Sequence, residues 1–169
     1  HLIEPGHFKP AVKEAIKSAS EEIKILTDNS EQPGFENTIA ALDRVGETLG
    51  KITSVLFNLN SADTNKTLQV VAQEVSPLLT RFSNDITLNE KLFERIKIVS
   101  ESIENSGLNT EQKILTERKF RNFMLGGAAL KQEDRKQFRV ISEELATLSL
   151  KFEENILEAV IGLPANLFF

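Results

Sequence analysis

The chain has 169 residues, of which 40% are hydrophobic, and this is enough for one folded domain with a core. Its formal net charge of -5 argues against binding to DNA or RNA, because nucleic-acid affinity is built from clustered Lys and Arg. The absence of cysteine excludes disulfides, thiolate metal sites and a Cys nucleophile, and no apolar run approaches the roughly 18 to 20 residues of a membrane helix. We therefore expect a soluble cytoplasmic domain, with the periplasm as the alternative compartment and no nucleic-acid or membrane partner.

Apolar residues recur at steps of three and four along nearly the whole chain, which is the spacing of one helix face. The first helix is expected to run from about Val12 to the turn residues 28–34, and the second to start near Phe35. Asn37 and Thr38 stand near that start, so we expect their side chains to meet free backbone or cap groups. The apolar stripe of the second helix comprises Ile39, Leu42, Val45, Leu49, Ile52 and Leu56.

A third helix is predicted after the polar turn at residues 58–65. Pro77 lies within it and should kink or break it, because proline lacks an amide hydrogen and its ring clashes with the preceding turn. The last and longest helix is expected from about Lys131. Its stripe comprises Phe138, Ile141, Leu145, Leu148, Phe152 and Ile156. We predict that Ile39, Leu42, Leu49 and Leu56 share one core with Phe138, Ile141, Leu145 and Phe152.

Two cap patterns divide the chain between these helices. Thr87 and Glu90 have the spacing of a capping box that would start a short fourth helix. Asn109 and Gln112 have the same spacing and would start a fifth helix, which should end at residues 126–127. There is no repeat of fixed period. The sequence therefore predicts an all-α fold, an antiparallel multi-helix bundle of about five to seven helices forming a single domain over residues 1–169.

The residues that could carry chemistry have simpler structural explanations. His7 could ligate a metal, but His1 is the only other histidine, and metal sites need three or four converging ligands. Adjacent acidic residues do not face each other on a helix and are expected on solvated faces. These pairs are Glu21-Glu22, Glu133-Asp134, Glu143-Glu144 and Glu153-Glu154. No Ser/His/Asp triad can be assembled. We therefore predict no catalytic, metal-binding or cofactor-binding residue in this chain.

A small basic cluster, Arg118, Lys119 and Arg121, stands beside Phe120 and Phe123. It could form a stacking patch for nucleic acid, but three cations in an acidic chain make a weak phosphate track. We favour a role at the end of the fifth helix, where cations complement free carbonyls and Gly126-Gly127 supplies a left-handed cap. The triplet Asn65-Lys66-Thr67 matches a glycosylation sequon by pattern alone and is assigned no function.

Three segments carry signatures of fixed spacing. They are His-Phe-Lys-Pro-Ala at residues 7–11, Phe-Glu-Asn-Thr-Ile at residues 35–39 with Leu42, and Leu-Ala-Thr-Leu at residues 145–148 followed by Phe152, Asn155 and Ile156. Together, from about Leu2 to Ala159, they resemble the amino-terminal helical region of the zinc oligopeptidase family that includes thimet oligopeptidase, oligopeptidase A and peptidyl-dipeptidase Dcp. In that family zinc is held by a His-Glu-x-x-His helix far downstream, and this sequence contains no such motif.

The resemblance implies a non-catalytic amino-terminal domain of a zinc-dependent oligopeptidase or peptidyl-dipeptidase. It implies that these helices form one wall of a channel for short peptides, with the catalytic domain of the same enzyme as partner. The alternative is a stand-alone helical interaction module without activity. Residues 160–169 form an atypical tail, since Gly162-Leu163-Pro164 comes sooner than in the family, and further sequence is expected before Leu2. A wall without its partner should expose apolar surface, so self-association is expected as well.

Overall fold

The computed structural model describes residues 3–62 and 65–161, and every regular element in them is a helix. The all-α prediction is therefore confirmed. In chain order the elements are α1 (Pro5–Asp28), the π-helix η1 (Phe35–Ala40), α2 (Ala41–Arg44), α3 (Glu47–Ala62), α4 (Lys66–Thr87), α5 (Glu90–Glu101), the 3-10 helix η2 (Ile103–Asn105), α6 (Thr110–Leu125) and α7 (Gln132–Ile161). The atypical tail lies outside the described residues except for residues 160 and 161, which continue α7.

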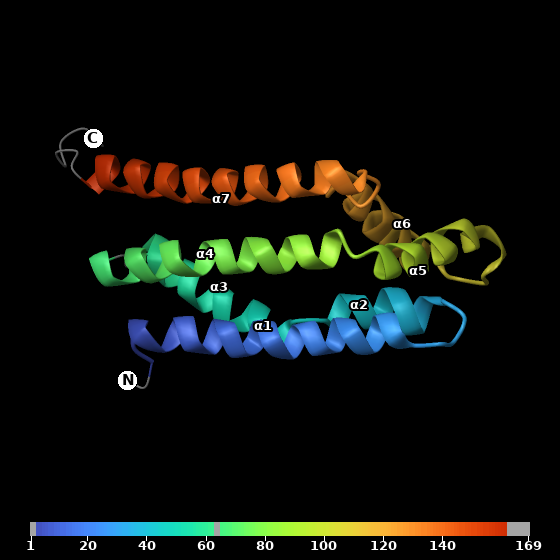
Figure 1. The fold of residues 1–169 in the computed structure, drawn as a ribbon. Helices are drawn as coiled ribbons and strands as arrows, with labels where there is room; N and C mark the ends of the chain where they lie inside the picture. Colours follow the sequence, from blue (N-terminus) through green and yellow to red (C-terminus); the bar gives the residue numbers. More distant parts are fainter. Residues whose placement is uncertain (1–2, 63–64, 162–169) are drawn as a thin grey trace, which may run out of the picture.

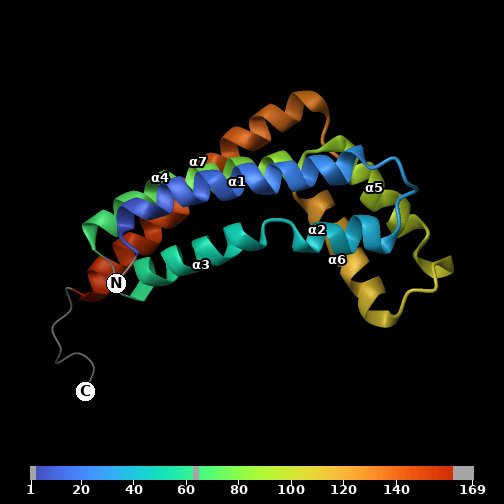
Figure 2. The ribbon, with the colours of Figure 1, turned by 90° about the horizontal axis from the view of Figure 1, so that it is seen from below.

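Three long helices lie side by side, with α4 between α1 and α7 (Figure 1). The shorter α3 packs against one face of α1 and α4 (Figure 2). The elements η1, α2, α5 and α6 gather at one end of this layer, and the start of α1 and the end of α7 lie at the other. None of the helices in the described residues is both long and apolar enough to cross a membrane.

Two apolar clusters form the core, one at each end of α1. The first joins α1 to η1, α2, α5 and α6, and its buried members are Ile23, Leu26, Ile39, Leu42, Leu92, Ile96, Val99, Phe123 and Ala128. The second joins α1 to α3 and α4, and its buried members are Phe8, Val12, Ala15, Leu49, Leu56, Leu68, Val71 and Val75. The predicted burial of Ile39, Leu42, Leu49 and Leu56 is confirmed, but they divide between the two clusters.

The second predicted helix is broken between these clusters. Gly46 has a φ of 73°, in the left-handed region that glycine tolerates best, and α3 begins at the next residue. The Gly46 amide donates a hydrogen bond of 3.0 Å to Glu22 Oε2 on α1, which satisfies the backbone at the break. Periodicity concealed this break because Leu42 and Leu49 are seven residues apart, the same interval that two helical turns would give.

The other predicted helix ends were right in part. The fourth helix lacks the Thr87–Glu90 capping box: Thr87 belongs to the end of α4, and Asn89 caps α5 by accepting a 3.0 Å hydrogen bond from the Leu92 amide. The Asn109–Gln112 capping box at the start of α6 is confirmed. Pro77 does not break its helix, since α4 runs without interruption past it.

Candidate functional site

His7 lies in the first turn of α1 and is exposed. Its Nδ1 accepts a hydrogen bond of 3.2 Å from the backbone amide of Glu4, so the imidazole satisfies a free donor at the helix start. His1 lies outside the described residues. Within residues 3–62 and 65–161, no group of three or more His, Asp or Glu side chains is placed to hold a metal ion.

One member of each of three acidic pairs makes a contact of its own. Glu22 caps the break at Gly46, and Glu143 on α7 forms an ion pair of 3.0 Å with Arg81 on α4. The prediction of solvated faces was wrong for Glu154, which is only 9% exposed between α4 and α7. Its Oε2 accepts a 2.7 Å hydrogen bond from Gln73, whereas Oε1 has no partner among the described residues. No two carboxylates of a pair converge across a cleft, as acid–base chemistry would need.

The basic cluster is also divided. Lys119 is largely buried and forms a 2.8 Å ion pair with Asp43, which ties α6 to α2, while Arg118 and Arg121 are exposed. The hydrogen bond from Lys119 lowers the pKa of Asp43 below its ordinary value of 3.8. The proposed role of these cations at the end of α6 was wrong, because the last turn of α6 has no basic residue. The predicted glycine cap is present, with Gly127 at a φ of 90°.

A polar cluster around Asn37 joins η1 to α5. Asn37 Oδ1 accepts hydrogen bonds from the Gly34 amide at 2.8 Å and the Thr38 hydroxyl at 3.0 Å, and its Nδ2 donates to Gln32 O at 3.0 Å. The predicted backbone role of Asn37 is confirmed, while Thr38 contacts the side chain of Asn37. Arg95, only 8% exposed, donates to Asn37 Oδ1 at 3.3 Å and to the carbonyl oxygen of Asn29 at 2.7 Å.

This cluster has a structural purpose. It fastens the loop between α1 and η1 to α5. Arg95 Nη1 donates to the carbonyl oxygens of Asn29 and Glu31 and Nη2 donates to Asn37, whereas Nε has no partner among the described residues. The sequence analysis did not predict burial of Arg95. Its position in the sequence could have indicated this burial. Arg95 stands three residues after Leu92 and one before Ile96, on the apolar face of a short helix.

The helix α7 turns its apolar stripe away from the rest of the molecule. The outer α7 stripe, as we name it, consists of Ile141 (54% exposed), Leu145 (62%), Leu148 (63%), Phe152 (66%) and Ile156 (48%). The prediction that Ile141, Leu145 and Phe152 lie in the core was therefore wrong, and Phe138 is only half-buried. Polar residues occupy the face of α7 that packs on α4.

The contacts between α4 and α7 explain this orientation. Asn84 donates to Ser142 Oγ at 2.8 Å, and Arg139 forms a 2.6 Å ion pair with Asp85. Leu150 is the one buried apolar residue among the α7 side chains that the structure describes. These α7 residues also recur at helical spacing, so the sequence contains a second, polar stripe beside the apolar one. That polar stripe marks the face of α7 that contacts α4. It could be recognised as the contact face only once its partners on α4 were placed.

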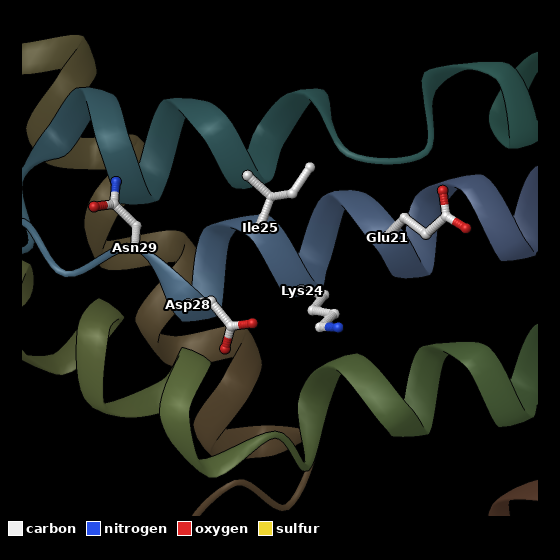
Figure 3. A pocket seen from close by; sticks show the side chains of 5 residues that line it. All are labelled: Glu21, Lys24, Ile25, Asp28 and Asn29. Carbon is white, nitrogen blue, oxygen red and sulfur yellow. The ribbon is translucent and has the colours of Figure 1, made fainter.

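Open hollows flank Ile25 on α1. One, of about 580 Å³, is lined by Glu21, Lys24, Ile25, Asp28 and Asn29. Another, of about 420 Å³, shares Ile25 and Asn29 and reaches η1 and α2. Figure 3 shows Lys24 and Asp28 pointing to one side of α1 and Ile25 to the other, so the polar groups do not converge on a common point. We assign no ligand to either hollow.

Comparison with protein families gives one match that covers most of the chain. Residues 12–135 match the family described as neurolysin/thimet oligopeptidase, N-terminal domain. The matched segment begins in α1 and ends in the first turn of α7. It contains the first apolar cluster, all of the second except Phe8, and the Asn37–Arg95 contact.

Comparison with individual proteins extends the match into α7. The chain is 38% identical over 153 residues to a dipeptidyl carboxypeptidase of Escherichia coli, which covers 90% of this chain and 22% of that protein. It is 35% identical over 157 residues to a dipeptidyl carboxypeptidase of Salmonella typhimurium, a match that covers 93% of this chain and 23% of that protein. It is 28% identical over 158 residues to the oligopeptidase A of E. coli, a match that covers 94% of this chain and 23% of that protein. The chain thus spans less than a quarter of the length of these curated relatives.

Proposed function

The chain belongs to the neurolysin/thimet oligopeptidase family as that family's N-terminal domain, and on this premise we propose that it is the non-catalytic part of a zinc-dependent peptidase. The observation that carries the proposal is the match of residues 12–135 to that domain, together with relatives named as peptidases. Zinc and its ligands would come from the catalytic domain, because the described residues offer no ligand group.

We further propose that the helical layer forms one wall of a channel that admits short peptides. The long helices α1, α4 and α7 lie side by side and give an extended surface, which suits a wall better than a closed globular core would (Figure 1). A wall would act by restricting access and orienting the substrate, while bond cleavage occurs on the opposite side. Its partners are then the catalytic domain and the peptide in transit.

The test is an exchange between this chain and a relative. The 169-residue chain replaces the matched stretch of the E. coli dipeptidyl carboxypeptidase, and cleavage of a short fluorogenic peptide is measured beside cleavage of unfolded casein. We expect the hybrid enzyme to cleave the short peptide and to spare casein, and the 169-residue chain alone to cleave neither. Chelator-sensitive cleavage by the chain alone would overturn the non-catalytic role. Cleavage of casein by the hybrid as fast as of the peptide would overturn the channel wall.

The outer α7 stripe favours a second candidate function, an interaction module that binds a separate protein. An exposed apolar stripe is typical of a surface that another protein covers. A hybrid enzyme that folds but cleaves nothing would support this alternative over the peptidase domain. An active hybrid enzyme would exclude it as the principal function.

A further inference from the structure

We propose that the outer α7 stripe is the docking surface for an apolar helix in the remaining part of the peptidase chain. The inference rests on the proposed function, and it assigns a specific contact to residues that the described part of the chain leaves exposed. The five residues of the stripe are separated by four, three, four and four positions, which places them on one side of α7. From Ile141 to Ile156 the stripe is about 22 Å long, at 1.5 Å per residue.

The two sides of α7 differ in chemistry. The inner side is joined to α4 by hydrogen bonds and ion pairs of Arg139, Ser142, Glu143 and Glu154. The outer side carries large branched and aromatic side chains at the a/d-like spacing by which helices pack together. A helix that is hydrogen-bonded to a neighbour on one side and apolar on the other is typical of a helix packed between two neighbours. Among the described residues, α7 has such a neighbour, α4, on its inner side alone.

The residues bordering the stripe indicate an apolar rather than a charged partner. Gln137, Ser149 and Asn155 lie at its margins and are exposed and uncharged. Glu144 and Lys151 lie further round one side of the helix and have opposite charges, and Glu153 lies about as far round the other side. Together these three carry a single net negative charge, too little to attract a nucleic acid or a strongly charged protein. It fits the apolar face of another helix, closed by polar groups at the rim.

The size of the stripe favours a partner within the same polypeptide. The five side chains of the stripe are each about half to two-thirds exposed, and their exposed surface area is on the order of 500 Å². A stable complex of separate proteins buries roughly 800 Å² on each side. A partner in the same chain needs less contact area, because the covalent connection gives it a high effective concentration. A second copy of this chain would have to associate through the smaller area alone.

The matched relatives are long enough to contain this partner helix. The family match ends at residue 135, and even a match that began at residue 1 would then cover 135 of 169 residues, about 80% of the chain. The E. coli dipeptidyl carboxypeptidase matches 90% of the chain, so the similarity to whole enzymes extends further along α7. More than three quarters of that relative lies outside the match. That unmatched length is where we place the covering helix.

The experiment compares Leu145→Asp with Thr147→Asp. Both positions are exposed in the middle of α7, but Thr147 lies off the stripe. In the 169-residue chain alone, both variants are expected to melt within about 2 °C of the unaltered chain, since exposed substitutions change stability little. In the hybrid enzyme, Leu145→Asp should lower the melting temperature by more than about 5 °C and peptide cleavage at least tenfold. Thr147→Asp should change neither.

The outcomes separate this inference from the proposed function. An unaltered hybrid enzyme that folds but is inactive counts against the proposed function. An active hybrid in which Leu145→Asp behaves like Thr147→Asp overturns the docking surface alone. A concentration-dependent dimer of the 169-residue chain that Leu145→Asp abolishes, without any effect of that substitution on the hybrid, identifies a second copy as the occupant and also overturns the inference.

A second measurement applies if the Leu145→Asp hybrid does not fold. The chain has no cysteine, so Leu145→Cys and Thr147→Cys each introduce one site whose labelling by a polar maleimide is read by mass spectrometry of its peptide. Cys at position 145 should react quickly in the 169-residue chain and at least tenfold more slowly in the hybrid, whereas position 147 should react quickly in both. Equal labelling of position 145 in the two proteins overturns the docking surface.

Discussion

The helices α1 to α6 and the helix α7 carry apolar stripes of the same spacing, but they use them in opposite ways. Leu56 on α3 is 0% exposed in a core cluster, whereas Leu148 on α7 is 63% exposed. Helical periodicity shows which residues share a face, and it does not show what that face packs against. The comparison teaches that an outward apolar stripe and a core stripe are indistinguishable until the neighbouring helix is placed.

The two regions are also held by different forces. Burial of apolar side chains stabilises the clusters around α1, at about 1.5 to 3 kcal/mol for each fully buried large side chain. The α4–α7 contact depends on polar pairs such as Arg139 with Asp85 and Asn84 with Ser142. Exposed ion pairs stabilise a protein by only about 0 to 1 kcal/mol each. We therefore expect α7 to be held less firmly than the helices around α1.

The largest expected difference comes from truncating one leucine in each region. Leu56→Ala should lower the free energy of unfolding by about 2 to 5 kcal/mol, because it leaves a cavity in a filled core. Leu148→Ala should change it by less than about 0.5 kcal/mol, since the side chain is already in solvent. Urea denaturation of the 169-residue chain, at a concentration where light scattering shows a monomer, measures both. Equal losses would contradict the contrast between the regions.

The approach of α6 to α4 provides a second, smaller contrast. A Cβ on Gly126 would clash with Thr87 Cγ2, so Gly126→Ala should destabilise the chain by about 1 to 3 kcal/mol through overpacking. Thr87→Ser removes that methyl group and should restore part of the loss. Gly50→Ala is the control, since nothing lies within 4 Å of its Cβ, and it should raise stability by roughly 0.5 to 1 kcal/mol. Thermal melting checks all three.

The polar cluster of η1 and α5 should be nearly as sensitive. Asn37→Ala removes the acceptor for the Gly34 amide and one of the acceptors for the buried Arg95 guanidinium. We expect a loss of about 1 to 3 kcal/mol, because a buried donor is left without its partner. Asn58→Ala, on the exposed side of α3, is the matched control and should cost less than about 0.5 kcal/mol. Urea midpoints that coincide for the two variants would show that the cluster is dispensable.

The smallest expected effect is the pH dependence of the α2–α6 ion pair. Lys119 lowers the pKa of Asp43 in the folded chain, so the pair contributes stability above the ordinary value of 3.8 and loses it as pH falls through the lowered folded pKa. Asp43→Asn should therefore cost about 0.2 to 1 kcal/mol at neutral pH and distinctly less near pH 2. Chemical denaturation at the two pH values measures the difference. A cost that persists at pH 2 would mean that packing, and not charge, is lost.

Sequence reasoning recovered the features that depend on nearby residues. The helical spacing, the capping box of Asn109 and Gln112 and the backbone contacts of Asn37 each involve groups within a few positions along the chain, and all are present in the structure. The burial of Ile39 and Leu56 also followed from their stripe, because α5 and α6 pack against η1 and α1 packs against α3. Local geometry and side-chain chemistry are sufficient for such predictions.

The tertiary structure decided what depends on distant partners. The break at Gly46 is satisfied by Glu22 on another helix, and the burial of Glu154 depends on Gln73, which is 81 residues away. The direction of the outer α7 stripe was set in the same way, since the partners of the polar stripe of α7 lie on α4. The sequence determined that α7 has two different faces. Only the placement of α4 decided which of them points inward, because a helix turns toward α4 the face whose polar groups α4 can satisfy.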